Sequence, residues 1–244
     1  MKRIAFVAVK GGTGRTTTAV HVAHGLALAG HRVALVDADP RNGVAACFGV
    51  EPGPGLAELL QGDTAHGFEV RHGLLLIASG GAALSRLDAD LAAGRRSGPS
   101  LDRLFESLAA CDVVLFDGAA ACAAVQRLVL QACSTWMVPF GADVLGLAAV
   151  RSGLAELRSM RVDVCDAVIE LLPTFHDPDA PFEATLVHAL ATEFADLAAP
   201  CRIRHSNALR AAPAQRGTVF ESDPWSEAAS DHARLVESLL GRAA

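Results

Sequence analysis

Short apolar runs alternate with longer amphipathic stretches along the whole chain. Runs of strand length occur at Ile4–Val9, Arg32–Asp37, Leu74–Ala78, Val113–Asp117, Thr135–Pro139, Ala167–Pro173 and Cys201–Arg204, with a further short edge strand predicted at Thr218–Phe220. Stretches of helical length and periodicity occur at Thr16–Ala29, Leu101–Ala110, Ala121–Cys133, Val144–Met160 and Phe182–Ala198. Asp223-Pro224 predicts the start of a final helix that runs to Leu240. Apolar strands that alternate with helices are typical of a mostly parallel sheet flanked by helices, so we predict an α/β fold.

The composition is consistent with a single domain over residues 1–244. Hydrophobic residues make up 51% of the chain and charged residues 20%, which is enough apolar material for a core and excludes a disordered chain. Gly94–Ser100 is predicted to be a surface loop rather than a linker between domains. No run approaches the ~20 apolar residues of a membrane span. A strand begins directly after Met1-Lys2-Arg3, which leaves no room for a signal peptide, so we expect a cytoplasmic protein.

The charge and the cysteines exclude several classes of protein. The formal net charge is −6, so nucleic acid or an anionic membrane would be attracted only by a local basic patch. The cysteines are isolated, with no C-x-x-C pair and no zinc spacing, and none lies in a glycine-rich loop that could carry an iron–sulfur cluster. We expect them to be small buried hydrophobes in a reducing compartment. They are Cys47, Cys111, Cys122, Cys133, Cys165 and Cys201.

A glycine-rich turn separates the first predicted strand from the first predicted helix. It reads Lys10-Gly11-Gly12-Thr13-Gly14-Arg15-Thr16-Thr17. The backbone N–H groups of such a turn can wrap a phosphate, and the N-terminus of the following helix adds positive partial charge. The Thr16 hydroxyl is placed to bind Mg²⁺. The strand before, the helix after, the two threonines and the leading lysine together favour a phosphate-binding loop over a purely structural turn.

This turn resembles the deviant Walker A box of the ParA/MinD ATPases, Lys-Gly-Gly-x-Gly-Lys-Thr-Thr, with Lys10 at the position of their signature lysine. Val36-Asp37-Ala38-Asp39-Pro40 resembles the D-x-D-P switch of that family, and Val113–Asp117 resembles its Walker B strand. Leu172–Asp177 and the tail from Ile203 to Ala229 also follow its pattern. The resemblance implies a P-loop NTPase fold, ATP and Mg²⁺ as cofactors, and an ATP-sandwich homodimer in which Lys10 reaches the partner's nucleotide.

Three positions depart from the family pattern. Arg15 replaces the lysine that family members use on the β- and γ-phosphates, and arginine is a larger planar fork rather than a compact ammonium. Arg41 stands where many members have glutamine, and Gly118-Ala119-Ala120 replaces a threonine followed by prolines. We expect nucleotide binding to survive these changes more easily than turnover.

Three aspartates follow predicted strands at the edge where open parallel sheets bind ligands. Asp37 and Asp39 end one strand, and Asp117 ends a strand whose other residues are hydrophobic. Taken alone, Asp37 and Asp39 could equally cap a turn, but the phosphate loop upstream favours a functional role. By resemblance, Asp37 lies near the magnesium ion and Asp39 orients or deprotonates the attacking water. Asp117 is expected to hold Mg²⁺ through a water molecule, and the alternative is an aspartate that simply ends the strand.

Two further surfaces are expected in the last third of the chain. By resemblance, adenine is expected between Pro173-Thr174 and the loop from Arg204 to Asn207. From Leu197 to Phe220 there is no acidic residue, and this stretch could contact DNA phosphates without reading bases, although its arginines could equally be ordinary solvated charges. These candidate DNA-binding residues are Arg202, Arg204, Arg210 and Arg216.

The expected function is that of an ATPase that positions or segregates a cargo. Catalysis is assigned to Lys10, Arg15 and Asp39, with weak basal turnover that a partner protein stimulates, and the protein is expected on the nucleoid when bound to DNA. The chain ends soon after Leu240 without the basic amphipathic helix of MinD-like members, so direct membrane binding is not expected. Two alternatives stay open: an accessory ATPase of cellulose secretion resembling BcsQ/YhjQ, and a nucleotide-binding scaffold with little or no hydrolysis.

Overall fold

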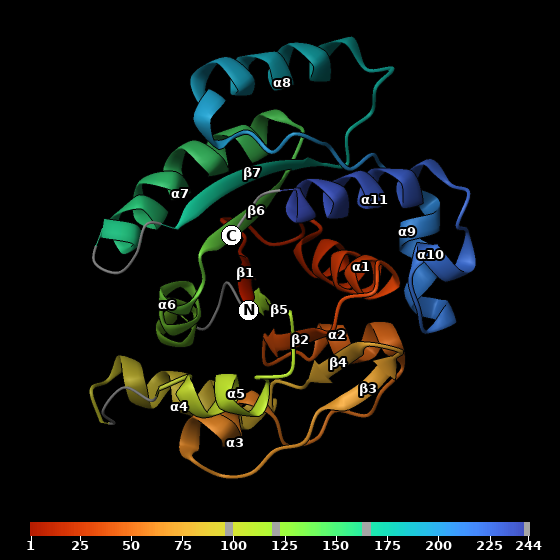
Figure 1. The fold of residues 1–244 in the computed structure, drawn as a ribbon. Coiled ribbons are helices and arrows are strands. Elements are labelled where there is room, and N and C mark those ends of the chain that lie inside the picture. Colours follow the sequence, from red (N-terminus) through yellow and green to blue (C-terminus); the bar gives the residue numbers. More distant parts are fainter. Residues whose placement is uncertain (96–99, 119–122, 163–166, 242–244) are drawn as a thin grey trace.

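The computed structural model describes residues 1–95, 100–118, 123–162 and 167–241. Within these residues, seven strands form one sheet in the order β3-β4-β2-β5-β1-β6-β7, and helices cover both of its faces (Figure 1). β3 is antiparallel to β4, and the other neighbouring pairs are parallel, which confirms the predicted fold class. The strands are β1 (Lys2–Phe6), β2 (Val33–Ala38), β3 (Phe68–Arg71), β4 (Leu74–Ile77), β5 (Val113–Gly118), β6 (Thr135–Gly141) and β7 (Val168–Thr174).

The helices divide between the two faces of the sheet. One hydrophobic core joins the sheet to α1, α2, α9, α10 and α11, and a second joins it to the helices from α3 to α8. The helices are α1 (Arg15–Leu28), α2 (Gly43–Phe48), α3 (Leu56–Gln61), α4 (Ala82–Ala92), α5 (Asp102–Ser107), α6 (Ala123–Ala132), α7 (Val144–Val162), α8 (Pro181–Glu193), α9 (Asn207–Ala211), α10 (Val219–Ser222) and α11 (Glu227–Leu240), with 3₁₀ turns at Ala195–Leu197 and Ala212–Gln215.

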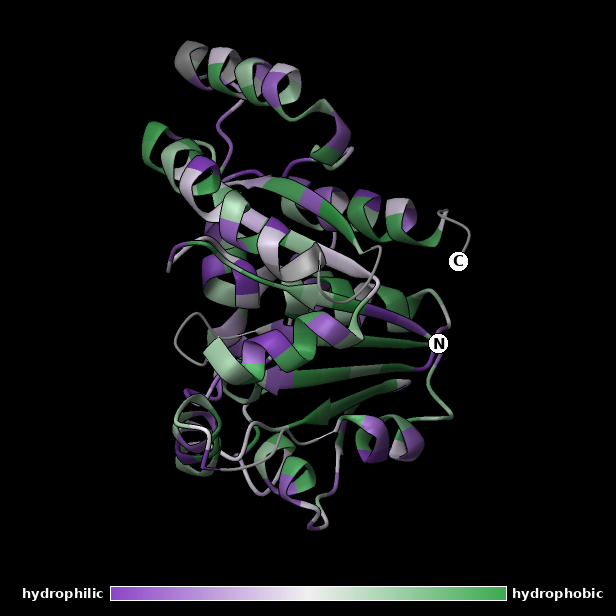
Figure 2. Ribbon diagram, turned by 90° about the vertical axis from the view of Figure 1, so that its left-hand side faces the viewer, coloured by the Kyte–Doolittle hydropathy of each residue, from purple (hydrophilic) through white to green (hydrophobic). Residues whose placement is uncertain are grey.

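The two cores explain why the strands are apolar throughout. Successive residues of a strand point to opposite faces, so Ile4 and Phe6 join the core of α1 and α11, and Ala5 joins the other core. The central strands are accordingly coloured as mostly hydrophobic in Figure 2. Trp136 of β6 is fully buried, and its indole N–H donates to the Leu130 carbonyl at 3.0 Å. Burial on both faces favours apolar residues along the strands, and the acids Asp37 and Asp117 lie at or next to the ends of β2 and β5.

Helices α1 and α11 lie side by side and run in the same direction. The imidazole rings of His21 and His232 are 4.7 Å apart between centroids, and one turn further along both helices Gly25 faces Val236. A Cβ on Gly25 would come within 2.8 Å of Val236 Cγ2, so only glycine lets the helices approach this closely. The final helix therefore packs on the helix that follows the glycine-rich turn.

Three predicted elements near the end of the chain differ in the structure. Cys201–Arg204 was predicted as a strand, but only Arg204 pairs, in an isolated bridge with His176. Thr218–Phe220 was predicted as an edge strand, but Thr218 caps the short helix α10 through a capping box with Glu221. The final helix begins at Glu227 behind the cap Ser226, rather than at Asp223-Pro224. In the last two cases a side-chain cap fixes where the helix begins.

Several elements were not predicted because their sequence signals are short or polar. Helices α2 and α3 have six residues each, and β3 is a four-residue antiparallel strand with two exposed residues. Helix α4 carries only two buried leucines, Leu84 and Leu87. Other predicted features lie outside the described residues: most of the Gly94–Ser100 loop, Ala119-Ala120, the start of the helix predicted from Ala121, Cys122 and Cys165.

The remaining cysteines form no disulfide with one another, and of these four Cys133 alone is fully buried. Burial raises the pKa of Cys47 and of Cys201 to about 11, so both are protonated near neutral pH. Among the residues that the structure describes, no helix combines the length and the apolar character needed to cross a membrane.

Candidate nucleotide-binding site

The glycine-rich turn lies between the end of β1 and the start of α1. Gly12 and Gly14 have φ values of 77° and 75°, which favour glycine. The Thr18 hydroxyl donates to the Gly14 carbonyl at 2.8 Å and fixes the entry into α1. The turn encloses a hollow of about 230 Å³, lined by Ala8, Lys10, Gly11, Gly12, Thr13, Gly14, Arg15, Thr16, Thr17 and Arg41. Its shape, its glycines and the N-terminus of a 14-residue helix suit a phosphate chain.

A second pocket of about 300 Å³ adjoins this hollow and shares Gly14 and Thr17 with it. It lies where an adenine site was predicted, between Thr174 and the loop after Ile203. Its other lining residues are Thr18, Phe175, Arg204, His205, Ser206, Leu209, Arg210 and Pro213.

Two predicted residues of this pocket do not line it. Pro173 is buried in β7, where its carbonyl accepts from the Ile203 N–H at 2.9 Å, and Asn207 is exposed as the first residue of α9. The Thr174 hydroxyl lies 2.9 Å from the Thr13 carbonyl and so ties the end of β7 to the glycine-rich turn.

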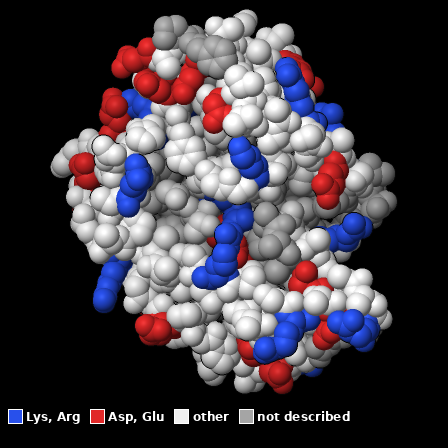
Figure 3. Space-filling view, turned by 180° about the vertical axis from the view of Figure 1, so that it is seen from behind, with Lys and Arg blue, Asp and Glu red and all other residues white. Residues whose placement is uncertain are grey.

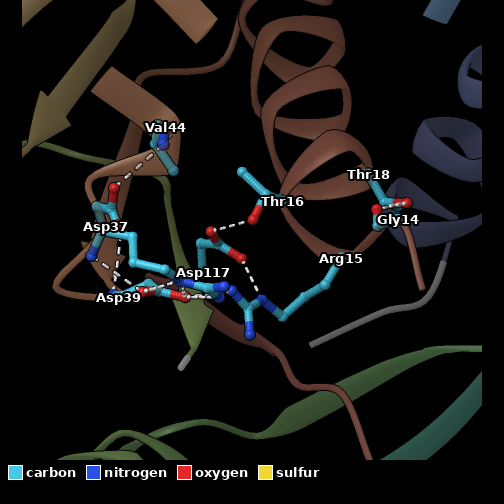
Figure 4. A network of polar contacts seen from close by, with 9 residues as sticks. Gly14, Arg15, Thr16, Thr18, Asp37, Asp39, Val44 and Asp117 are labelled. Carbon is cyan, nitrogen blue, oxygen red and sulfur yellow. Dashed lines mark hydrogen bonds and ion pairs between the residues drawn. The ribbon is translucent and has the colours of Figure 1, made fainter. Parts of the chain in front are cut away.

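The three predicted aspartates come together at the carboxyl ends of β2 and β5. Asp37 and Asp117 are partners in the parallel register of these strands, and both are fully buried. Asp37 accepts from the backbone N–H of Asp39 at 2.9 Å and of Val44 at 3.1 Å. Asp117 accepts from the Thr16 hydroxyl at 2.7 Å (Figure 4). The sheet therefore brings these carboxylates beside Thr16 and Arg15 of the glycine-rich turn.

Arg15 connects two of these acids. Its Nε donates to Asp117 Oδ1 at 2.7 Å, and its Nη2 donates to Asp39 Oδ2 at 2.9 Å (Figure 4). The residue is only 7% exposed. Arg41 also pairs with Asp39, with Nη2 to Oδ2 at 2.6 Å, but the Arg41 side chain is 78% exposed. The sequence predicted that Arg15 contacts the phosphates of the nucleotide. In the structure its guanidinium is hydrogen-bonded to Asp117 and Asp39.

These contacts and burial shift the pKa values of the three aspartates in different directions. Burial and the nearby charge of Asp117 raise the pKa of Asp37 to about 7. Burial also disfavours ionisation of Asp39, but hydrogen bonds from Arg41 and Arg15 outweigh it and lower the pKa of Asp39 to about 2. Burial raises the pKa of Asp117 against the opposing effect of Arg15. In the described part of the chain, no three His, Cys, Asp or Glu side chains converge to hold a metal ion by themselves.

The four candidate DNA-binding arginines do not form one surface. Arg202 and Arg204 line a hollow of about 490 Å³ together with Arg234, which sequence reasoning missed because it lies in α11. Arg204 is bound there to Asp231 and Glu227. Arg210 lines the pocket beside Thr174, and Arg216 packs over Gly49. On the face shown in Figure 3, basic and acidic side chains are interspersed.

Comparisons with known proteins agree with the fold and the site. A family model described as an AAA domain matches residues 1–166. The chromosome-partitioning ATPase Soj of Thermus thermophilus is 28% identical over 99% of this chain and 96% of its own length. The cell division protein PomZ of Myxococcus xanthus is 25% identical over 99% of this chain and 78% of its own length.

Solved structures show the same architecture. McdA from Cyanothece superposes with a TM-score of 0.83 at 20% identity, covering 99% of this chain and all of that one. The Pyrococcus furiosus cell division ATPase MinD gives a TM-score of 0.73 at 16% identity, with 98% of each chain covered. The glycine-rich turn, the acids beside it and these matches show that the chain belongs to the ParA/MinD family of P-loop ATPases.

Proposed function

We propose that this chain is an ATP-binding, slowly hydrolysing switch. It forms an ATP-sandwich homodimer and positions or segregates a DNA locus or protein assembly through non-specific DNA binding. The observation that carries this is the continuity of the phosphate hollow with the pocket at Thr174, which together offer a place for a phosphate chain and for a base. The names of the relatives Soj and PomZ place them in chromosome partitioning and cell division, which supports a positioning role.

ATP and Mg²⁺ are the proposed cofactors. The loop from Lys10 to Thr17 would hold the phosphates. The Thr16 hydroxyl and the carboxylates of Asp37 and Asp117 are the hard oxygen donors that Mg²⁺ prefers, and the bound ion would neutralise charge on the phosphates. A variant of McdA has been solved with ATP, and cobyrinic acid a,c-diamide synthase of Mycobacterium smegmatis has been solved with an ATP analogue and magnesium.

Hydrolysis is assigned to Asp39, with Lys10 and Arg15 acting on the phosphates. Asp39 is ionised over the neutral range and is bound to Arg41, which lines the hollow, so its proposed role is to orient the attacking water. The structure keeps a second candidate open. Because Arg15 is bound to Asp39 and Asp117, a nucleotide-binding scaffold with little hydrolysis is also supported. Phosphate release measured with and without a partner protein separates the two.

Dimerisation tests the proposed function most directly. Lys10 is exposed at the head of the loop, whereas the other lysine of the chain, Lys2, donates to the Leu239 carbonyl at the opposite end of β1. We expect light scattering to show a monomer that becomes a dimer with ATP and Mg²⁺. Lys10→Ala should abolish the change, and the matched variant Lys2→Ala should retain it. An unchanged mass at saturating ATP would contradict the proposal.

A further inference from the structure

Every carboxylate oxygen of the acidic cluster formed by Asp37, Asp39 and Asp117 already accepts a hydrogen bond from the protein. Asp37 is satisfied by backbone N–H groups alone. Asp39 accepts hydrogen bonds from the side chains of Arg15 and Arg41. Asp117 accepts hydrogen bonds from the side chains of Arg15 and Thr16. The oxygens that suit a divalent cation by chemistry are therefore engaged by donors of the chain itself.

Arg15 differs from the other donors because it bridges two separate carboxylates. Its Nε donates to Asp117 in β5, and its Nη2 donates to Asp39, which directly follows β2 (Figure 4). An ammonium has one nitrogen and acts as a point charge, whereas the guanidinium fork can serve both acids at fixed geometry. The arginine at this position is thus suited to replace a cation between the two acids.

Burial strengthens the electrostatic interaction between Arg15 and the two acids. Arg15 is 7% exposed, Asp39 is 4% exposed and Asp117 is fully buried, so their charges are poorly screened by water. Arg41 pairs with Asp39 from a largely solvated position, whereas the buried Arg15 pairs with Asp117 as well. Without Arg15, two buried acids would face each other with only an exposed arginine for compensation.

We propose that Arg15 is a resident counter-ion that occupies the cation position between Asp39 and Asp117, so that its guanidinium and a divalent metal ion exclude each other there. The nucleotide-free protein therefore does not bind a metal ion between these acids. Metal can bind there only when the guanidinium of Arg15 turns away from them. Arg15 also lines the phosphate hollow, where incoming phosphates offer it a second set of anionic partners. This inference extends the proposed function, but it concerns the protein without nucleotide.

Manganese binding to the nucleotide-free protein tests the proposal. Mn²⁺ has oxygen preferences like those of Mg²⁺, and electron paramagnetic resonance distinguishes its free and bound forms. We expect no specific Mn²⁺ site in the wild type. Arg15→Gln removes the charge and should create one site, at least ~10-fold tighter than any wild-type binding, because the buried acids then lack a cation. Adding Asp117→Asn to Arg15→Gln should remove that site.

One control variant and two contrary outcomes complete the test. Arg41→Gln removes an exposed arginine from Asp39 but leaves Arg15 between the two acids, so it should create no specific Mn²⁺ site. Tight Mn²⁺ binding by the wild-type protein would overturn the proposal even if Arg15→Gln does not fold. A folded Arg15→Gln, verified by circular dichroism, that binds no Mn²⁺ would also overturn it. Because no nucleotide is present, this outcome is independent of the dimerisation test.

Discussion

Arg15 is held by acids from two neighbouring strands, and this determines what a lysine would do in its place. A lysine ammonium can approach the β–γ bridge of a triphosphate more closely than a guanidinium, and its single nitrogen cannot reproduce the two-nitrogen contact that Arg15 makes with Asp117 and Asp39. Both differences favour the transition state for phosphoryl transfer over the resting arrangement.

We therefore predict that Arg15→Lys raises basal ATPase activity with little change in nucleotide affinity. One well-placed contact to the developing charge contributes on the order of 3 kcal/mol to the barrier, which sets an upper bound of about a hundredfold in rate. Steady-state phosphate release and a fluorescent-nucleotide titration measure the two quantities. A variant slower than the wild type would mean that the loop has adapted to arginine.

At the residue scale, the sequence predicted the members of the site better than their contacts. The glycine-rich turn and the three acids could be located because each has a local signature: glycines before a helix, or an acid at the end of an apolar strand. The partners of Arg15 could not be predicted in this way. Asp117 lies 102 positions away in the sequence, and only the parallel register of β2 and β5 brings it beside Asp39 and Arg15.

At the scale of elements, the packing of α1 against α11 buries two histidines. His21 and His232 are 1% and 0% exposed, and burial lowers their pKa values to about 3 and about 4. The His232 Nδ1 contacts the Ala228 carbonyl, and its Nε2 has no hydrogen-bond partner among the described residues. Both rings are therefore neutral in the folded protein but become protonated below pH ~6.5 when it unfolds.

This arrangement predicts a loss of stability in acid. Because the folded pKa of His232 lies below the unfolded value, its contribution is complete above pH ~6.5 and decreases as the pH falls toward 4. Between pH 7 and pH 5, His232→Leu should lose about 2 kcal/mol less unfolding free energy than the wild type. Urea denaturation at both pH values measures this, with the exposed His188→Leu as the matched control. An equal loss in wild type and His232→Leu would contradict the assignment.

The elements themselves were predictable where burial is strong. The buried strands β1, β2, β4, β5, β6 and β7 all coincide with predicted apolar runs. The errors at Cys201–Arg204 and Thr218–Phe220 arose because short apolar segments satisfy either periodicity, and the bridge to His176 and the capping box with Glu221 determine their backbone. The antiparallel strand β3 has exposed residues and follows no apolar alternation that could reveal it.

At the scale of the whole molecule, the distribution of arginines decides how DNA could be bound. With a net charge of −6, the chain needs a local basic surface, and Arg202 and Arg234 are exposed around the same hollow. Arg216 lies apart against α2. The proposed DNA contacts are thus concentrated around the end of β7 and α11.

We predict weak, sequence-independent DNA binding in the ATP state alone, with a steep dependence on salt. Replacing Arg202 and Arg234 together by alanine should reduce the slope of log affinity against log salt by about two per subunit, because each neutralised phosphate contributes roughly 0.9. Arg216→Ala is the matched control and should leave the slope unchanged. Fluorescence anisotropy over a salt series measures it, and equal binding without nucleotide would count against a positioning role.

The placement of the tryptophans makes the molecule its own optical reporter. The chain has two tryptophans and no tyrosine, so its ultraviolet emission comes almost entirely from two indoles. Trp136 is sealed between strands and helices, whereas Trp225, just before α11, is 95% exposed. Acrylamide will therefore quench the emission of Trp225 but not that of Trp136. In Trp225→Phe, the remaining blue-shifted signal follows the core alone, and in Trp136→Phe the red-shifted signal follows whatever approaches the start of α11.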